Sequence, residues 1–235
     1  MIELLIASAK EVKKDWMIVT PFWVFFFGFQ TLSLIASHLF LIDTSPSLTT
    51  ILSYATVWVL ELFIKCIIMT VSQKQSISYA LSQTLSQFNK IITTSILILL
   101  PVALLLIAIT HNASGNTFQQ FILFIGFIVI VIPALLIQQF LPLPYLLESE
   151  PLLSGLKKTA RLIQNNLLPV IRYILWIFLI SLSTLIFSSI LKQVPFIGKS
   201  ILVVGIQGIT ATIIAIFTAK VYTHILKKSN VTTSA

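Results

Sequence analysis

The sequence predicts an all-α protein of the membrane, with about six transmembrane helices. Of its 235 residues, 57% are hydrophobic and only 9% are charged, whereas about a quarter of the residues of a soluble domain are charged. Mean hydropathy is +1.02. Several apolar stretches also reach the roughly 20 residues with which a helix crosses a bilayer core. Lipid is therefore the expected environment for most of the surface.

Six stretches are long enough to cross the membrane, and we treat residues 1–235 as one membrane domain. The first lies within the uncharged run 16–42, which is longer than the apolar region of about 7–15 residues in a signal peptide. The connectors are too short for a soluble domain. The predicted spans are residues 17–42, 48–71, 91–110, 119–142, 167–191 and 201–224.

The distribution of Lys and Arg predicts the orientation of these spans, because cytoplasmic loops are rich in both residues. With the N-terminus inside, only Lys192 and Lys199 fall on the outer side. The net charge of +8 is scattered between spans, which fits membrane loops better than nucleic-acid binding. Both termini are predicted to be cytoplasmic. The cytoplasmic cations are Lys10, Lys13, Lys14, Lys74, Lys90, Lys157, Lys158, Arg161, Lys227 and Lys228.

Three cytoplasmic segments read as amphipathic helices, each followed by a span. Such helices can lie among lipid headgroups, or they can pack on neighbouring spans. Residues 80–92 and 155–167 also align without a gap, which suggests repeated units of one helix plus a hairpin. The predicted apolar faces are Ile2, Leu5, Ala9, Val12 and Trp16; Ile77, Leu81, Leu85 and Phe88; and Leu152, Leu156, Ala160 and Ile163.

Several prolines in the middle of the chain are expected to mark kinks or ends of helices. Pro101 and Pro133 lie inside the third and fourth spans, where we expect each to break or kink its helix. Pro142 and Pro144 are expected to end the fourth span. Pro151 stands where a new helix begins, with Glu148 and Glu150 near the positive end of its dipole.

This region resembles the YciC family of bacterial inner-membrane proteins and, more distantly, the membrane domains of some glycerophosphodiester phosphodiesterases. The likeness rests on the turn at residues 131–133, the basic helix at 156–162, and Asn166 before the fifth span. Residues 72–78 also resemble a link in the family, although Lys74 replaces an expected Gly. The resemblance implies a bacterial inner-membrane protein without a known molecular activity.

Catalytic and metal-binding motifs are absent from the sequence. His38, His111 and His224 are far apart, and Cys66 is the single cysteine. We therefore expect neither an enzyme nor a metal or other cofactor.

Two opposite charges, Glu61 and Lys65, lie one helical turn apart within the second span. A charge near the bilayer centre costs roughly 2.5–3.5 kcal/mol. The two residues can form an ion pair, Glu61 can be protonated, or Lys65 can extend to the interface. A contact with another span, for which Arg172 is the candidate, and an ion or proton path are the remaining readings.

The cations Lys157, Lys158 and Arg161 form one face of the third amphipathic helix. Near an anionic leaflet each is worth about 1 kcal/mol, so the face can hold phospholipid headgroups; it can also act only as a topology signal. We expect a non-enzymatic protein that maintains the envelope through contacts with phospholipids, with a membrane-protein partner or with a second copy. The rival functions are a small-solute or ion transporter or channel, and the permease subunit of an ABC exporter.

Overall fold

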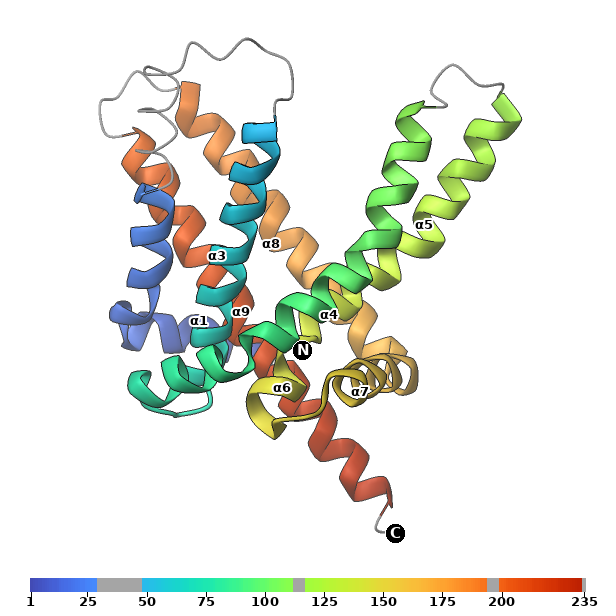
Figure 1. Cartoon of the computed structure of the whole chain (residues 1–235). Coiled ribbons are helices and arrows are strands. Elements are labelled where there is room, and N and C mark those ends of the chain that lie inside the picture. Colours follow the sequence, from blue (N-terminus) through green and yellow to red (C-terminus); the bar gives the residue numbers. More distant parts are fainter. Residues whose placement is uncertain (29–47, 112–116, 194–198, 234–235) are drawn as a thin grey trace. The chain divides into compact units, whose positions relative to one another are not determined.

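The computed structural model describes residues 1–28, 48–111, 117–193 and 199–233, and within these ranges the regular structure is entirely helical (Figure 1). The chain divides into two compact units. Unit 1 comprises Met1–Ala80 and Leu168–His224, and unit 2 comprises Leu81–Leu167 and Ile225–Ala235. The elements are α1 (Ile2–Lys14), η1 (Trp16–Val19), α3 (Leu48–Val71), α4 (Ile77–His111), α5 (Thr117–Phe140), α6 (Pro142–Glu148), α7 (Leu152–Asn165), α8 (Leu167–Gln193) and α9 (Lys199–Thr233).

Four helical stretches in the described part of the chain are long and apolar enough to cross a membrane. They are Ile77–Leu105, Val129–Glu148, Leu167–Leu191 and Ile201–Lys227. A shorter apolar helix, Trp16–Gly28, starts the predicted first span, whose continuation to residue 42 lies outside the described residues. Helix α3 has the bounds of the predicted second span. The number six stays a prediction.

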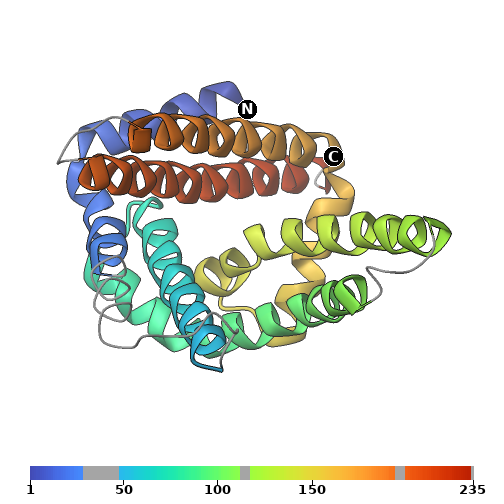
Figure 2. The ribbon, with the colours of Figure 1, turned by 90° about the horizontal axis from the view of Figure 1, so that it is seen from above.

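Within unit 1, α8 and α9 lie side by side (Figure 2). Hydroxyl groups join them: Tyr173 Oη lies 2.6 Å from Thr218 Oγ1, and Thr184 Oγ1 lies 3.0 Å from Thr210 Oγ1. The ring centroids of Tyr173 and Phe217 are 5.2 Å apart. Interhelical hydrogen bonds of this kind stabilise helix pairs in lipid, where no water competes for the hydroxyls.

The predicted second amphipathic segment is not a separate helix. Helix α4 runs without interruption from Ile77 to His111, because no Gly or Pro interrupts the sequence before Pro101. Its 35 residues extend about 52 Å at 1.5 Å per residue, and a bilayer core is about 30 Å thick. The polar N-terminal part of α4 therefore extends beyond the core in line with its span. Helix α7, in contrast, ends at the cap residue Asn166.

Pro101 and Pro133 do not break their helices. Both lie inside continuous helices, α4 and α5, so neither residue ends its helix. A kink at each position stays a prediction. A proline removes one backbone hydrogen bond, but packing against a neighbouring helix can maintain the rest of the ladder in a membrane. The buried cluster of Val102, Val131 and Ala134 lies beside both prolines. Pro142 does stand at a boundary, where α5 ends and α6 begins.

The predicted apolar faces differ in their surroundings. On α4, Ile77 is 71% exposed and Leu85 is 61% exposed, whereas Ala80 and Thr84 are fully buried. The apolar face of this helix is therefore turned outward. On α7 the predicted face is mostly turned inward, and Ile163 is buried. On α1 the predicted face is divided: Val12 is buried, and Ile2, Ala9 and Trp16 are exposed.

Candidate functional site

The basic helix α7 is fixed at both ends by its neighbours in the chain. Ser149, in the left-handed conformation with φ 53°, ends α6, and Pro151 then precedes the first residue of α7. At the other end, Asn166 Nδ2 donates to the Leu162 carbonyl at 3.0 Å. Both ends of α7 are therefore defined by residues that are close to it in sequence.

Tyr145 on α6 is the residue on which α7 packs. Its side chain is fully buried, and its hydroxyl donates to the Leu152 carbonyl at 2.5 Å. The Thr94 hydroxyl on α4 donates to the Tyr145 oxygen at 3.2 Å. A Cβ atom added at Gly155 would lie 2.4 Å from the Tyr145 ring. Only glycine therefore allows α7 to approach this ring so closely.

Helix α4 also contacts the end of α6 and the link between α6 and α7, which comprises residues 149–151. Gln83 Nε2 donates to the Leu146 carbonyl and to Ser149 Oγ, at 3.2 Å in each case. Lys90 Nζ donates to the Glu150 carbonyl at 3.4 Å. Polar side chains of α4 thus satisfy backbone oxygens of the link, and they fix the position from which α7 begins.

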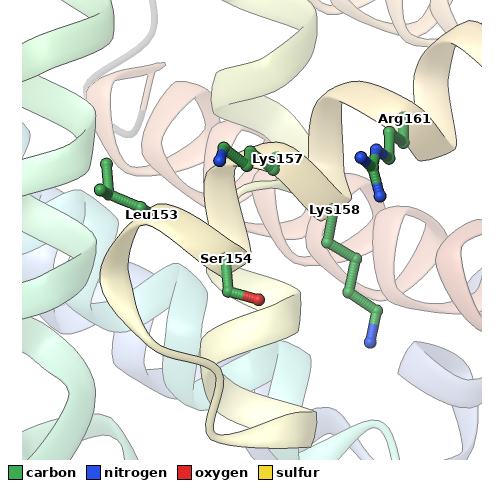
Figure 3. A pocket seen from close by; sticks show the side chains of 5 residues that line it. All are labelled: Leu153, Ser154, Lys157, Lys158 and Arg161. Carbon is green, nitrogen blue, oxygen red and sulfur yellow. The ribbon is translucent and has the colours of Figure 1, made fainter.

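The outer face of α7 carries a hollow of about 450 Å³, lined by three cationic side chains, one hydroxyl and one leucine. Lys157 and Arg161 on this face are exposed, as is Leu153 at its apolar end. Figure 3 shows the lining residues on α7, with the amines of Lys157 and Lys158 pointing in different directions. The lining residues are Leu153, Ser154, Lys157, Lys158 and Arg161.

Lys158 differs from the other two cations because two carboxylates bind it. Its Nζ lies 3.0 Å from Glu150 Oε1 and also forms an ion pair with Glu148. The Ser154 hydroxyl donates to Glu150 Oε2 at 2.7 Å. Glu148 and Glu150 were predicted near the positive end of α7, and the structure additionally gives them a cationic partner on the same helix.

These contacts shift two pKa values in opposite directions. Hydrogen bonds from Ser154 and Lys158 hold the pKa of Glu150 below its usual value. Partial burial lowers the pKa of Lys158, but hydrogen bonds to Glu148 and Glu150 outweigh it, so the pKa of Lys158 is raised. Both shifts favour the charged forms of the two residues.

The arrangement therefore presents two outward cations, Lys157 and Arg161, beside an ion-pair cluster in which two carboxylates hold Lys158. A guanidinium such as Arg161 binds phosphate oxygens bidentately, and an ammonium such as Lys157 adds a flexible point charge. The chemistry that this face supports is reversible binding of an anion.

The predicted intramembrane charge pair and its candidate partner lie in unit 1. Glu61 on α3 and Arg172 on α8 are exposed, and Lys65 is half-buried one turn after Glu61. The ion pair between Glu61 and Lys65 stays a prediction, as does a contact of this pair with Arg172. Cys66 is a buried free thiol. Among the described residues, no group of three or more His, Cys, Asp or Glu side chains could hold a metal ion; His38 lies outside these residues.

Sequence reasoning missed the residues that position α7. Tyr145, Gly155, Thr94 and Gln83 meet only when α4, α6 and α7 are packed together. The one local signal was a glycine inside an amphipathic helix, which costs stability unless a neighbour needs the space.

Comparisons with protein families, with curated proteins and with solved structures found no match to the chain.

Proposed function

We propose that the chain is a polytopic bacterial inner-membrane protein that binds the phosphate of anionic phospholipids on the outer face of α7. This activity would serve the envelope maintenance that its resemblance to the YciC family implies. The apolar helices of the described part provide the membrane location that such a function requires. The observation that carries the proposal is the hollow on α7, with Lys157 and Arg161 exposed at its edge.

Charge supports a phospholipid as the ligand. Three cations and two carboxylates in and beside the hollow leave one positive charge. That charge matches the single negative charge of a phosphodiester headgroup. Leu153, which is 63% exposed, provides an apolar contact at the same face, where an acyl chain can replace water.

The outward apolar face of α4 supports a position beside the membrane. Leu81 and Leu85 are exposed in the same unit whose polar residues Gln83 and Lys90 hold the link before α7. Leucines in this arrangement match the boundary between headgroups and acyl chains, with the polar groups directed toward the protein. Lipid contact is accordingly the reading we favour for this part of α4.

The test is native mass spectrometry of the full chain, extracted in mild detergent, beside the double variant Lys157→Gln, Arg161→Gln. The wild type is expected to retain an anionic phospholipid that the variant loses. Lys158 is left intact because its removal would disrupt the ion pairs with Glu148 and Glu150.

A matched control removes two exposed cations elsewhere, with Lys74→Gln and Lys227→Gln, and should keep the lipid. Equal lipid retention by the α7 variant and the control would overturn the proposal. A stoichiometric bound protein in place of lipid would identify the face as an assembly surface instead.

A further inference from the structure

Helix α1, in unit 1, carries two different faces. Ser8 and Val12 are buried, and Glu11 is half-buried on the same side. On the opposite side, Ile2 is 53% exposed and Ile6 is 48% exposed. Lys10 and Lys13 lie along the same exposed arc. Large aliphatic side chains thus alternate with lysines on a face that the rest of the described chain does not cover.

An ion pair fixes the position of α1 along the axis of α9. Glu11 Oε2 lies 2.6 Å from Lys220 Nζ. Position 220 is about 32 Å along α9 from its first residue, at 1.5 Å per residue, and the hydrocarbon core of a bilayer is about 30 Å thick. If α9 spans the membrane from its first turns, Lys220 reaches the far boundary of the core, and Glu11 holds α1 at that boundary.

The end of α1 points to the same location. The Asp15 carboxylate accepts a hydrogen bond from the Met17 N–H at 3.1 Å and caps the turn that leads into the apolar helix Trp16–Gly28. The ring of Trp16 stacks on Trp23 at 6.3 Å between centroids, yet Trp16 remains 51% exposed. Exposed tryptophans are enriched where a membrane helix meets the headgroup region.

We propose that α1 is a surface-binding helix that lies in the headgroup region of the leaflet where α9 emerges, with Ile2 and Ile6 inserted among acyl chains. Lys10 and Lys13 would contact lipid phosphates from the same arc, since long lysine side chains can reach upward from a shallow apolar position. The partner is an anionic bilayer surface. This site uses other residues than the α7 face, so it is independent of the headgroup site proposed there.

Depth measurements by spin labelling test this proposal. The full chain, with Cys66→Ala to remove the native thiol, is labelled at Ile6→Cys or at Lys14→Cys. Each protein is reconstituted in phosphatidylcholine vesicles with and without phosphatidylglycerol. We expect the label at residue 6 to be accessible to oxygen and protected from a water-soluble nickel complex. The label at residue 14 should show the opposite preference.

A second variant keeps the proposal open to refutation. Adding Ile2→Gln and Lys10→Gln to the residue 6 label should abolish its preference for oxygen, while the thermal stability of the protein stays near that of the parent. A label at residue 6 that remains accessible to nickel in both vesicle types would overturn the proposal. Strong dipolar coupling between labels at residue 6 would overturn it too, because a second copy would then cover Ile2 and Ile6.

Discussion

At the scale of single residues, the contact between Gly155 and Tyr145 determines how closely α7 approaches α6. A methyl group at residue 155 would lie 2.4 Å from an atom of the Tyr145 ring, and this ring is fully buried. Overpacking of this kind typically costs about 1–3 kcal/mol. We therefore expect Gly155→Ala to lower the thermal unfolding temperature of the detergent-solubilised protein.

The matched control for this prediction is Gly126→Ala in α5. A Cβ at residue 126 would meet only Leu105 Cδ1, at 3.9 Å, which is an ordinary contact. This substitution should be neutral or stabilising, because alanine favours a helix by about 0.5–1 kcal/mol over glycine. If Gly155→Ala proved equally harmless, the close packing of α7 on Tyr145 would be contradicted.

The ion pair of Glu150 and Lys158 gives a second prediction, for the dependence of stability on pH. In the folded protein the pKa of Glu150 lies below its usual value of 4.5. Its contribution to the stability of the fold is therefore present above pH 4.5 and is lost as the pH falls through the folded pKa. The folded pKa of Lys158 lies above 10.5. Its contribution is therefore complete below pH 10.5 and is lost as the pH rises through the folded value.

Thermal unfolding of Glu150→Gln and wild type across this pH range measures both effects. The wild type should be more stable at pH 7, and the difference should disappear in the acidic range. Glu3→Gln on α1 removes an equal charge from a residue outside the cluster and should show no such pH dependence. A stability difference that stays constant down to pH 3 would mean that the ion pair does not stabilise the fold.

At the scale of elements, the two carboxylates set the number of cations that α7 offers. Glu148 and Glu150 bind Lys158, so the proposed phosphate site relies on Lys157 and Arg161. The double variant Glu148→Gln, Glu150→Gln should release Lys158 and tighten the binding of anionic phospholipid. One cation near a membrane surface is worth about 1 kcal/mol, which corresponds to about fivefold in affinity.

Titration of the variant in nanodiscs of increasing phosphatidylglycerol content would measure this change. The control variant Glu3→Gln removes an exposed carboxylate from α1 and should leave affinity at the α7 face unchanged. Weaker binding by Glu148→Gln, Glu150→Gln would show that the ion pairs mainly position α7. Such a result would leave the proposed phosphate site itself intact.

The helices differ in how far their sequences could predict them. The start of α7 after Pro151 and its end at Asn166 agree with local cap signals, as does the beginning of α6 at Pro142. The continuity of α4 through residue 90 does not follow from the sequence pattern, because the change from polar to apolar composition suggests a boundary there. Composition alone does not end a helix, and backbone hydrogen bonding continues until a residue interrupts it.

The candidate site could be predicted only in part, for the same physical reason. Lys157 and Arg161 follow from helical spacing alone, and both are exposed. The ion pairs of Lys158 with Glu148 and Glu150 depend on the left-handed turn at Ser149. That turn brings the end of α6 back toward α7, and helical periodicity contains no information about it.

At the scale of the whole molecule, the number of spans decides which surfaces face the cytoplasm. The described helices include four stretches with the length and composition of spans; α3 and the helix Trp16–Gly28 would make six. Single cysteines in a Cys66→Ala background distinguish these cases. We expect a membrane-impermeant maleimide to label Ser45→Cys and Ser114→Cys in intact cells, because both lie in predicted external connectors. Gln164→Cys on α7 should be labelled only after permeabilisation.

The Ser45→Cys variant distinguishes six spans from four. Its labelling from outside would require the chain to cross the membrane both before and after residue 45, and the total would then be six. Protection of Ser45→Cys, with Ser114→Cys still labelled, would keep the first two apolar segments on the cytoplasmic side and leave four spans. Both counts are even, so both place the two termini on the same side. In either case, labelling of Gln164→Cys from outside would contradict a cytoplasmic α7 and with it the proposed contact with cytoplasmic-leaflet phospholipid.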